Sequence, residues 1–334
     1  MRLDDRVRLT TDPREAAVAL LDGHLAALPT ETVDGLGARA DLAAAVAQVY
    51  SVKGRPADHP LIVHIAGTNA LEAWGASIPR YARTLADSTW PGPLTLVVNR
   101  TSAAQDFVTG GQNSVALRVS AHPIMSSVLA HLVKLTGNDS IGIAAPSANR
   151  FGRVSPTSAS HVVSELAHFL SHDDVVLDGG ECGVGLESTI IDCTGAHPRL
   201  LRPGAITADD VERLTGLECP AGSIVRASGT LAKHYQPAAT VRIVQAADLL
   251  DRRSLPPGAE APAVGLLAMA GIATPAGVVR LAAPHSADEY ARVLYAALRE
   301  ADALRLETIF AVAPEPAGIG AAVIDRLTRA AHNS

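Results

Sequence analysis

Apolar runs and helix-spaced apolar positions alternate along the first part of the chain. Short apolar runs, which predict strands, lie at 25–29, 60–65, 94–98, 115–119, 141–145 and 175–177. Apolar residues at helical spacing, which predict helices, lie at 41–52, 69–90, 123–135 and 158–170. Runs at 187–192 and 198–201, joined by Thr194-Gly195, predict a hairpin. Because crossover and hairpin connections are both present, we expect a mixed α/β sheet rather than a purely parallel one.

Three polar stretches carry the signals of helix starts. Asp12-Pro13-Arg14-Glu15 places Asp at the N-cap, Pro at the first helical position and Glu at the third. Thr207-Ala208-Asp209-Asp210 and Ser286-Ala287-Asp288-Glu289 predict two further caps. Each signal is local, because the capping side chain and the amide that it accepts from lie within one turn of helix.

The pattern changes after about residue 216. The segment 218–238 contains several prolines and glycines and lacks steady periodicity, so it predicts a linker. Beyond it, strands at 240–244, 263–267 and 309–313 alternate with helices and predict a small Rossmann-like unit with a parallel sheet. We therefore expect a first domain at 1–217, a linker at 218–238 and a small α/β domain at 239–334. No glycine-rich phosphate loop follows the first strand of the last domain, so cofactor binding is not expected there.

Composition and charge exclude several classes of protein. The chain has 334 residues, 48% of them hydrophobic but only 3% aromatic, which predicts a globular protein with aliphatic cores. The formal charge of −6 argues against a basic protein that binds polyanions over its whole surface. Three cysteines without a close-spaced pair predict no disulfide framework and a reduced, cytoplasmic setting. The start Met-Arg-Leu-Asp-Asp-Arg lacks an apolar leader, and we expect no membrane span.

The densest chemistry lies in three neighbouring motifs. They read Leu28-Pro29-Thr30-Glu31-Thr32-Val33-Asp34-Gly35-Leu36-Gly37, Val52-Lys53-Gly54-Arg55-Pro56 and Leu61-Ile62-Val63-His64-Ile65. Lys53 and Arg55 stand two residues apart at a predicted helix end, where both can point toward a polyphosphate. The glycines of these motifs would let a ligand approach the backbone closely. Taken alone, the two cations are equally a solvated helix end, and His64 is more often a core histidine.

The motifs resemble those of the threonylcarbamoyl-AMP synthases of the YrdC-like family, in order and in spacing. That family has P-T-E-T-V-Y-G-L-G, then K-G-R-P, then P-L-I-V-H; Asp34 stands where tyrosine is usual. Ser228 to Pro237 resembles the linker of the two-domain form, and Gly320 to Leu327 the end of its C-terminal domain. The resemblance implies a mixed, twisted YrdC-like sheet in a catalytic domain, followed by the small parallel α/β domain.

The resemblance also implies the site, residue by residue. For catalysis it implies Lys53 and Arg55. For L-threonine it implies Thr32, His64, Arg118, Ala145 and Ser188. For ATP it implies Arg55, His59, Ser114, Ser147, Asn149, Ser155, Arg202 and Tyr235. His59 replaces a common asparagine, and Tyr235 would close over the nucleotide as part of a linker lid. No protein metal site is implied, and Mg²⁺ is expected to arrive with ATP.

The implied reaction joins three small molecules. Bicarbonate or CO₂ adds to the amine of L-threonine, and the new carboxylate attacks the α-phosphate of ATP to give threonylcarbamoyl-AMP and pyrophosphate. The residues include no obvious nucleophile, so positioning and charge neutralisation would carry the catalysis. The product would pass to a tRNA threonylcarbamoyl transferase complex for the synthesis of N6-threonylcarbamoyladenosine, and tRNA itself need not bind here.

Asp34 leaves part of this prediction open. A carboxylate close to a polyphosphate is repelled unless Mg²⁺ or Arg55 intervenes, or unless it points away into a helix N-terminus or a salt bridge. One alternative is a paralogue that adenylates another carbamoylated substrate, as hydrogenase-maturation carbamoyltransferases act on carbamoyl phosphate; their C-x₂-C pairs do not occur here. A second alternative is a module that binds double-stranded RNA, which the negative charge and the lack of basic tracts disfavour.

Overall fold

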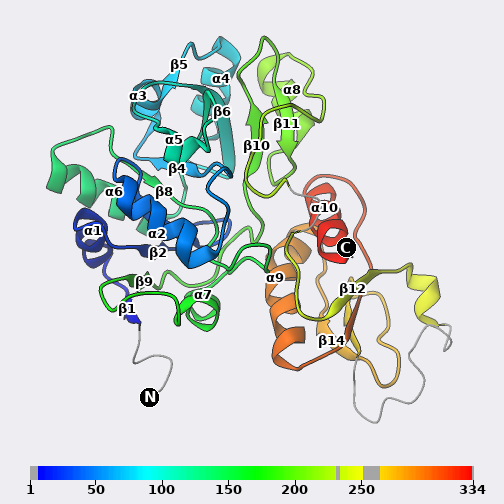
Figure 1. The fold of residues 1–334 in the computed structure, drawn as a ribbon. Helices are drawn as coiled ribbons and strands as arrows, with labels where there is room; N and C mark the ends of the chain where they lie inside the picture. Colours follow the sequence, from blue (N-terminus) through cyan, green and yellow to red (C-terminus); the bar gives the residue numbers. More distant parts are fainter. Residues whose placement is uncertain (1–6, 231–233, 251–263, 333–334) are drawn as a thin grey trace. The chain divides into compact units, whose positions relative to one another are not determined.

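The computed structural model describes residues 7–230, 234–250 and 264–332 (Figure 1). Residues 1–6, the stretch 231–233 of the predicted linker and the first residue of the strand predicted at 263–267 lie outside the described residues. The chain divides into two compact units. Unit 1 contains residues up to 151 together with 156–183 and 187–230, and unit 2 contains 152–155, 184–186 and the residues from 231 onward. The change of unit at 230–231 falls inside the segment predicted as a linker.

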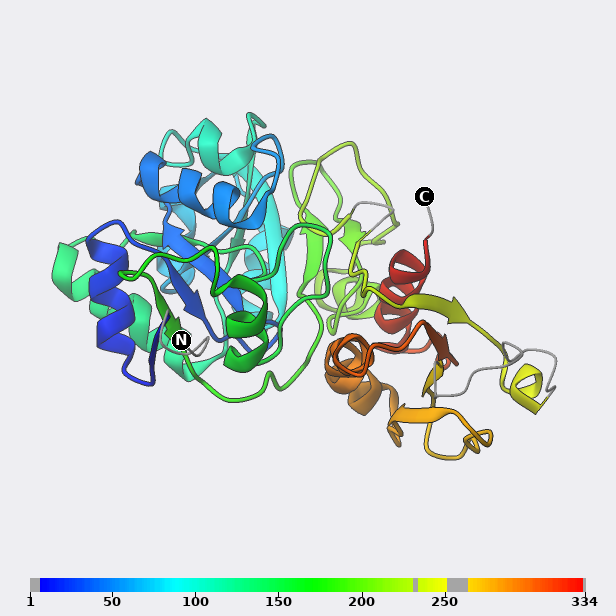
Figure 2. The same cartoon turned by 60° about the horizontal axis from the view of Figure 1, so that its bottom comes forward.

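Unit 1 is built on a mixed sheet, which confirms the expected fold class. Among the described residues its strands are β1 (Arg8–Thr10), β2 (Ala26–Leu28), β3 (Gly35–Arg39), β4 (Ile62–Ile65), β5 (Gly75–Ala76), β6 (Leu94–Arg100), β7 (Ser114–Arg118), β8 (Gly142–Ala144), β9 (Val175–Leu177), β10 (Thr189–Asp192) and β11 (Arg199–Arg202). They follow the order β1-β9-β2-β3-β8-β4-β7-β6-β10-β11, and β5 pairs with β6. β4 and β7 run parallel, whereas β6 is antiparallel to β7. The predicted hairpin is β10–β11, which lies beside the cyan strand β6 in Figure 2.

Unit 1 contains eight described α-helices, of which the first and the last begin at caps predicted from the sequence. They are α1 (Pro13–Leu21), α2 (Ala43–Lys53), α3 (Leu71–Trp74), α4 (Arg80–Thr89), α5 (Asp106–Thr109), α6 (Pro123–Thr136), α7 (Ala159–Leu166) and α8 (Ala208–Thr215). The Asp12 side chain accepts from the amide of Arg14 at 2.8 Å, and Thr207 with Asp210 forms a capping box. The helical sequence expected at 69–90 contains α3 and α4, and β5, which pairs with β6, separates the two helices.

The two faces of the unit 1 sheet are covered differently. One face packs on a large apolar cluster that includes Val63, Ile65, Leu96 and Leu117. The other face carries two smaller clusters at separate places. The first lies under α1 and α6, which pack against each other (Figure 1) and bury residues such as Leu20, Leu28, Leu129 and Ile143. The second contains Ile62, Val97, Ala116 and Ile190.

Unit 2 contains the small parallel sheet expected from the sequence. Its described elements are β12 (Thr240–Ile243), β13 (Val264–Leu267), β14 (Val279–Ala282), β15 (Thr308–Ala311), α9 (Ala287–Ala303) and α10 (Gly320–Ala331). The strand order is β12-β15-β13-β14, and the pairs are parallel. Ser286 caps α9 by accepting from the amide of Glu289 at 3.1 Å, as predicted. In the described part of the chain, no helix is long and apolar enough to cross a membrane.

Candidate functional site

Strand alternation places the polar residues of β4 and β7 on the less covered face of the unit 1 sheet. Val63 and Ile65 point into the large cluster, so the residue between them points the other way. That residue is His64, and in the parallel register it lies directly beside Arg118 of β7. Thus two residues predicted for L-threonine, from separate strands, lie side by side on the sheet face.

Arg118 is held by partners from two other segments. Its Nη1 donates to Thr32 Oγ1 at 2.7 Å, its Nε donates to the carbonyl of Gly92 at 3.2 Å, and its Nη2 lies 2.7 Å from Glu31 Oε1. Burial favours the neutral acid, but Arg118 and hydrogen bonds from Ser120 and the Ala121 amide outweigh it and lower the pKa of Glu31 to about 2. The guanidinium is therefore charge-balanced and fixed beside Thr32.

His64 has an unused hydrogen-bonding atom in this position. The residue is only 3% exposed, and among the described residues its Nδ1 has no hydrogen-bond partner. Burial and then the charge of Arg118 lower the pKa of His64 to about 3, against the opposing charge of Glu31. A buried, neutral imidazole with an unpaired nitrogen is costly unless another group completes the bond. This nitrogen is where a small polar ligand would be satisfied.

Ser188 connects the predicted threonine residues to a predicted ATP residue. Its hydroxyl lies 2.7 Å from Thr95 Oγ1, on β6, and Arg202 Nη2 donates to the same hydroxyl at 3.1 Å. Arg202 Nε also donates to the carbonyl of Ser188 at 3.0 Å. Since Leu96 pairs with Leu117, Thr95 lies at the level of Arg118 in the neighbouring strand. The two predicted subsites are thus adjacent on one sheet face.

Arg55 reaches the same region from the end of α2. Its Nη2 donates to the carbonyl of Pro60 at 2.9 Å and to Ser228 Oγ at 3.1 Å. Arg202 Nη1 donates to the carbonyl of Ser228 at 2.9 Å. His59 lies alongside, with its ring edge-on to that of Phe151 at 5.3 Å between centroids. Ser228, which is not among the predicted site residues, therefore contacts both predicted ATP arginines.

Lys53 lies beneath this surface, with its side chain fully buried. Its Nζ donates to the carbonyls of Ser147 and Asn149, both at 2.5 Å. Burial, followed by the charge of Arg55, holds the pKa of Lys53 well below its usual value, although Glu165 opposes the shift. In this structure Lys53 thus holds the turn that carries two predicted ATP residues. Its contact with phosphate stays a prediction.

Protein packing explains the glycines of the motifs. Gly54 ends α2 in the left-handed conformation, with φ of +60°. A Cβ on Gly37 would lie 2.9 Å from Ile143 Cγ2 and 3.0 Å from Leu28 Cδ1. At these two glycines the helix end and neighbouring side chains make the close approach, and close approach by a ligand stays a prediction.

Four further predicted residues extend the site or lie outside unit 1. Ala145 follows β8, and its amide donates to the carbonyl of Ile62 at 2.9 Å. Ser114 is the first residue of β7 and shares the face of Arg118, about 13 Å away at four residues of strand. Ser155 and Tyr235 belong to unit 2, so unit 1 alone does not hold them. Their predicted roles at ATP stay predictions.

Tyr235 is a core residue of unit 2. It is 1% exposed, stacks on Tyr295 with 5.5 Å between ring centroids, and has the guanidinium of Arg326 at 5.4 Å. Its backbone φ is +61°, which is uncommon for a residue with a side chain. The surrounding aromatic and cationic contacts hold this conformation within the unit.

Asp34 is buried away from the arginines just described. Cys182 Sγ donates to its Oδ1 at 3.5 Å, and in the described part of the chain the carboxyl group has no ion pair and caps no helix. Burial raises the pKa of Asp34 to about 7; the Cys182 hydrogen bond opposes the shift and the charge of Asp178 adds to it. Among the described residues, the carboxyl group thus forms neither the salt bridge nor the helix cap that was one of the expectations, and burial favours its neutral form.

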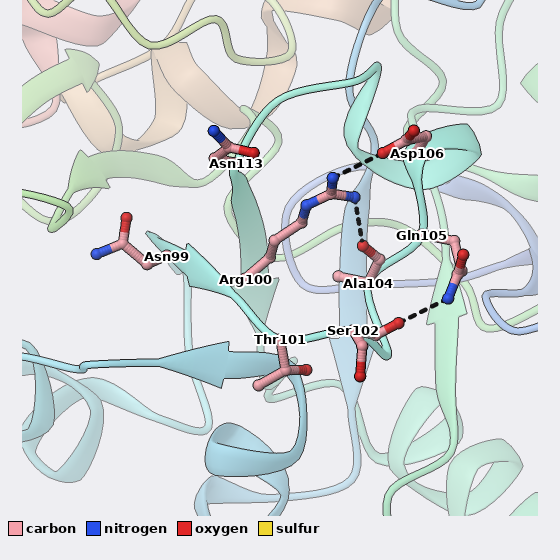
Figure 3. Close-up of a pocket in the computed structure, with 8 residues that line it drawn as sticks. All are labelled: Asn99, Arg100, Thr101, Ser102, Ala104, Gln105, Asp106 and Asn113. Atoms are coloured by element: carbon pink, nitrogen blue, oxygen red, sulfur yellow. Dashed lines mark hydrogen bonds and ion pairs between the residues drawn. The ribbon is translucent and has the colours of Figure 1, made fainter.

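A cavity of about 540 Å³ lies elsewhere on unit 1, at the end of β6 (Figure 3). It is lined by Asn99, Arg100, Thr101, Ser102, Ala104, Gln105, Asp106 and Asn113. Arg100 crosses it to pair with Asp106 at 2.7 Å and to donate to the carbonyl of Ala104. None of the residues predicted for threonine or ATP lines this cavity, so it is not the candidate site.

Comparisons with known proteins identify the family of this chain. The family described as "Telomere recombination" matches residues 18–204, and "Threonylcarbamoyl-AMP synthase, C-terminal domain" matches 206–332. The threonylcarbamoyl-AMP synthase of Pyrococcus abyssi is 38% identical over 95% of this chain and 93% of its own length. That of Bacillus subtilis is 35% identical over 96% of this chain and 94% of its own length.

A solved structure shows the same arrangement of elements. The crystal structure of Pyrococcus abyssi Sua5 complexed with L-threonine is similar to this chain with a TM-score of 0.84 and 35% identity, covering 97% of each chain. Sequence and fold thus agree over nearly the whole length, and the family expected from the motifs is confirmed. The chain belongs to the threonylcarbamoyl-AMP synthases, with a YrdC domain followed by a C-terminal domain of the Sua5 type.

Proposed function

We propose that this protein makes threonylcarbamoyl-AMP and pyrophosphate from L-threonine, bicarbonate or CO₂, and ATP, for the threonylcarbamoyladenosine modification of tRNA. The observation that supports it best is the direct contact between Ser188 and Arg202. This contact joins a subsite that suits an amino acid to one that suits a triphosphate, on one face of one sheet. A tRNA threonylcarbamoyl transferase complex would consume the product.

The threonine end offers complementary groups for a zwitterionic amino acid. Arg118 is oriented by Thr32 and Gly92 to meet a carboxylate. The unpaired Nδ1 of neutral His64 can accept or donate a hydrogen bond beside it. The similar protein of Pyrococcus abyssi has been solved in complex with L-threonine.

The nucleotide end supplies positive charge without a nucleophile. Arg55 and Arg202 are 8% and 3% exposed, so their charges act in a partly desolvated setting. There they would neutralise the triphosphate while an oxygen of N-carboxythreonine bonds to the α-phosphorus and the bond to the pyrophosphate oxygen breaks. Such an in-line displacement depends on positioning and on stabilisation of developing charge.

We propose that Mg²⁺ reaches this site bound to ATP rather than to a protein cage. Among the described residues, no group of three or more His, Cys, Asp or Glu side chains could hold a metal ion. Mg²⁺ commonly takes most of its ligands from substrate phosphates and water. The chain's own contribution to charge neutralisation is therefore cationic.

Pyrophosphate release tests the proposal, assayed with ATP, Mg²⁺, bicarbonate and each amino acid in turn. We expect release to require bicarbonate and to be strongest with L-threonine. A preference for another amino acid would instead favour the paralogue that acts on a different carbamoylated substrate. If pyrophosphate release does not depend on any amino acid, and if the protein binds double-stranded RNA with a steep dependence on salt, the RNA-binding module is the better interpretation.

A further inference from the structure

Residues 223–230, here called the docked segment, lie along the functional face of the unit 1 sheet. Ser223 Oγ donates to Asp192 Oδ2 at 2.6 Å. The amide of Arg226 donates to Gln112 Oε1 at 2.8 Å, and Gln112 Nε2 donates back to the carbonyl of Arg226 at 3.1 Å. Val225 and Ala227 pack on the apolar cluster of Ile62, Val97, Ala116 and Ile190. The docked segment is therefore fixed on unit 1 by both polar and apolar contacts.

Ser228 is the residue of this segment at which two guanidinium groups meet. Its hydroxyl accepts from Arg55 Nη2 at 3.1 Å and donates to the carbonyl of Pro60 at 3.0 Å. Arg55 Nη2 also donates to that carbonyl, at 2.9 Å, so the three groups form a closed triangle. The carbonyl of Ser228 accepts from Arg202 Nη1 at 2.9 Å. One residue thus orients two arginines that come from distant parts of the chain.

We propose that Ser228 is a positioning residue of the nucleotide subsite, which presents Arg55 and Arg202 to the triphosphate at a preset spacing. The proposal rests on the proposed function, because that function assigns both arginines to ATP. Arginine side chains have many rotamers, and ordering them on binding costs free energy. The Pro60 carbonyl fixes the Ser228 hydroxyl, and the hydroxyl in turn orders Arg55 before ATP binds. Less free energy is then lost on binding, so the affinity for ATP depends on this hydroxyl.

The hydroxyl and the carbonyl of Ser228 can be separated by mutation. Ser228→Ala removes the bond from Arg55 together with the bond to the Pro60 carbonyl, and it leaves the carbonyl of Ser228 for Arg202. We expect the Kd and the KM for ATP to rise about five-fold, which corresponds to ~1 kcal/mol for one lost hydrogen bond. The KM for L-threonine should stay unchanged, because the Ser228 hydroxyl bonds to Arg55 and Pro60 and not to Arg118, Thr32 or His64. Ser228→Thr keeps the hydroxyl and should restore the native Kd.

Two variants in the same segment provide matched controls. Thr230→Ala also deletes a hydroxyl, but the one that it deletes donates to the carbonyl of Ala227 at 2.9 Å rather than contacting an arginine. Ser223→Ala loosens the docking at Asp192 without touching the triangle. Thermal unfolding of each variant shows whether unit 1 keeps its stability. We expect Thr230→Ala to bind ATP with the native Kd.

Calorimetric titration of the full chain with MgATP, together with pyrophosphate kinetics, decides the matter. A five-fold rise in Kd for Ser228→Ala, absent in Ser228→Thr and Thr230→Ala, supports the proposal. An unchanged Kd overturns it, as does an equal rise in Thr230→Ala. A lower Kd also overturns it, because Ser228 would then compete with phosphate for the arginines. If the native chain releases no pyrophosphate, the proposed function fails, while the Kd comparison still tests Ser228.

Discussion

Replacing Asp34 by Asn should stabilise the protein at neutral and alkaline pH. The carboxyl group is 3% exposed, and its hydrogen-bond donor is the Cys182 thiol. Burial favours the protonated acid and raises the pKa of Asp34 from 3.8 to about 7. An asparagine Oδ1 can accept the same bond at nearly the same volume but never ionises. The substitution therefore removes the cost of ionisation, and it adds a buried amide NH₂ group whose cost does not change with pH.

The size and sign of this effect follow from the pKa shift. The pKa of Asp34 is higher in the folded than in the unfolded state. The contribution of Asp34 to the free energy of unfolding is therefore fully present below pH 3.8 and is lost as pH rises toward 7. A shift from 3.8 to about 7, at 1.36 kcal/mol per unit, corresponds to at most ~4 kcal/mol. The free energy of unfolding of Asp34→Asn should therefore exceed that of the native protein by up to this amount above pH 7, and by little near pH 4.

Urea unfolding of both proteins between pH 5 and 9 measures this difference. The exposed Asp139, changed to Asn, is the matched control and should show no such pH dependence. We expect the gain from Asp34→Asn to grow up to about pH 7 and then to level off. A gain that is independent of pH, or a loss at every pH, would show that the carboxyl group is not held in its neutral form.

Three further perturbations test other parts of the structure. Arg55→Ala should lower the rate of pyrophosphate release by about 10²-fold, by analogy with the loss of a transition-state donor, and near-normal release would exclude a catalytic role. Gly37→Ala should lower the free energy of unfolding by about 1–3 kcal/mol, because the new Cβ would overlap Ile143 and Leu28; an unchanged urea midpoint would contradict the packing. A chain ending at Leu217 loses the docked segment and Ser228, so its ATP turnover should fall strongly, and full activity in the same assay would count against any role for residues beyond 217.

The candidate site was only partly predictable from the sequence. The resemblance implies Thr32, His64, Arg118 and Ser188 as site residues, and strand alternation explains why His64 and Arg118 share a face. The partners of Lys53 could not be predicted, because its Nζ bonds to backbone carbonyls more than ninety residues away. Backbone carbonyls carry no sequence signature. Ser228 was missed for a similar reason, since an isolated serine in a linker resembles any other turn residue.

What the sequence determined by itself is the local part of this structure. Asp12, Thr207 and Ser286 cap their helices as predicted, because a cap needs only a side chain and an amide within one turn. The mixed character of the large sheet and the parallel character of the small one also followed from the order of elements. Only the tertiary structure decided which strands are neighbours, so it placed β5 between the two helices at 69–90 and added β14 to the small sheet.

The same division explains the chemistry. Residue types and their spacing indicate which side chains a ligand requires, and this can be read along the chain. The protonation states of these side chains cannot be read along the chain, because the burial and the neighbouring charges that set them come from residues far apart in sequence. Asp34 shows this most clearly: its pKa near 7 depends on enclosure by the fold and on Cys182 and Asp178, almost one hundred and fifty residues away.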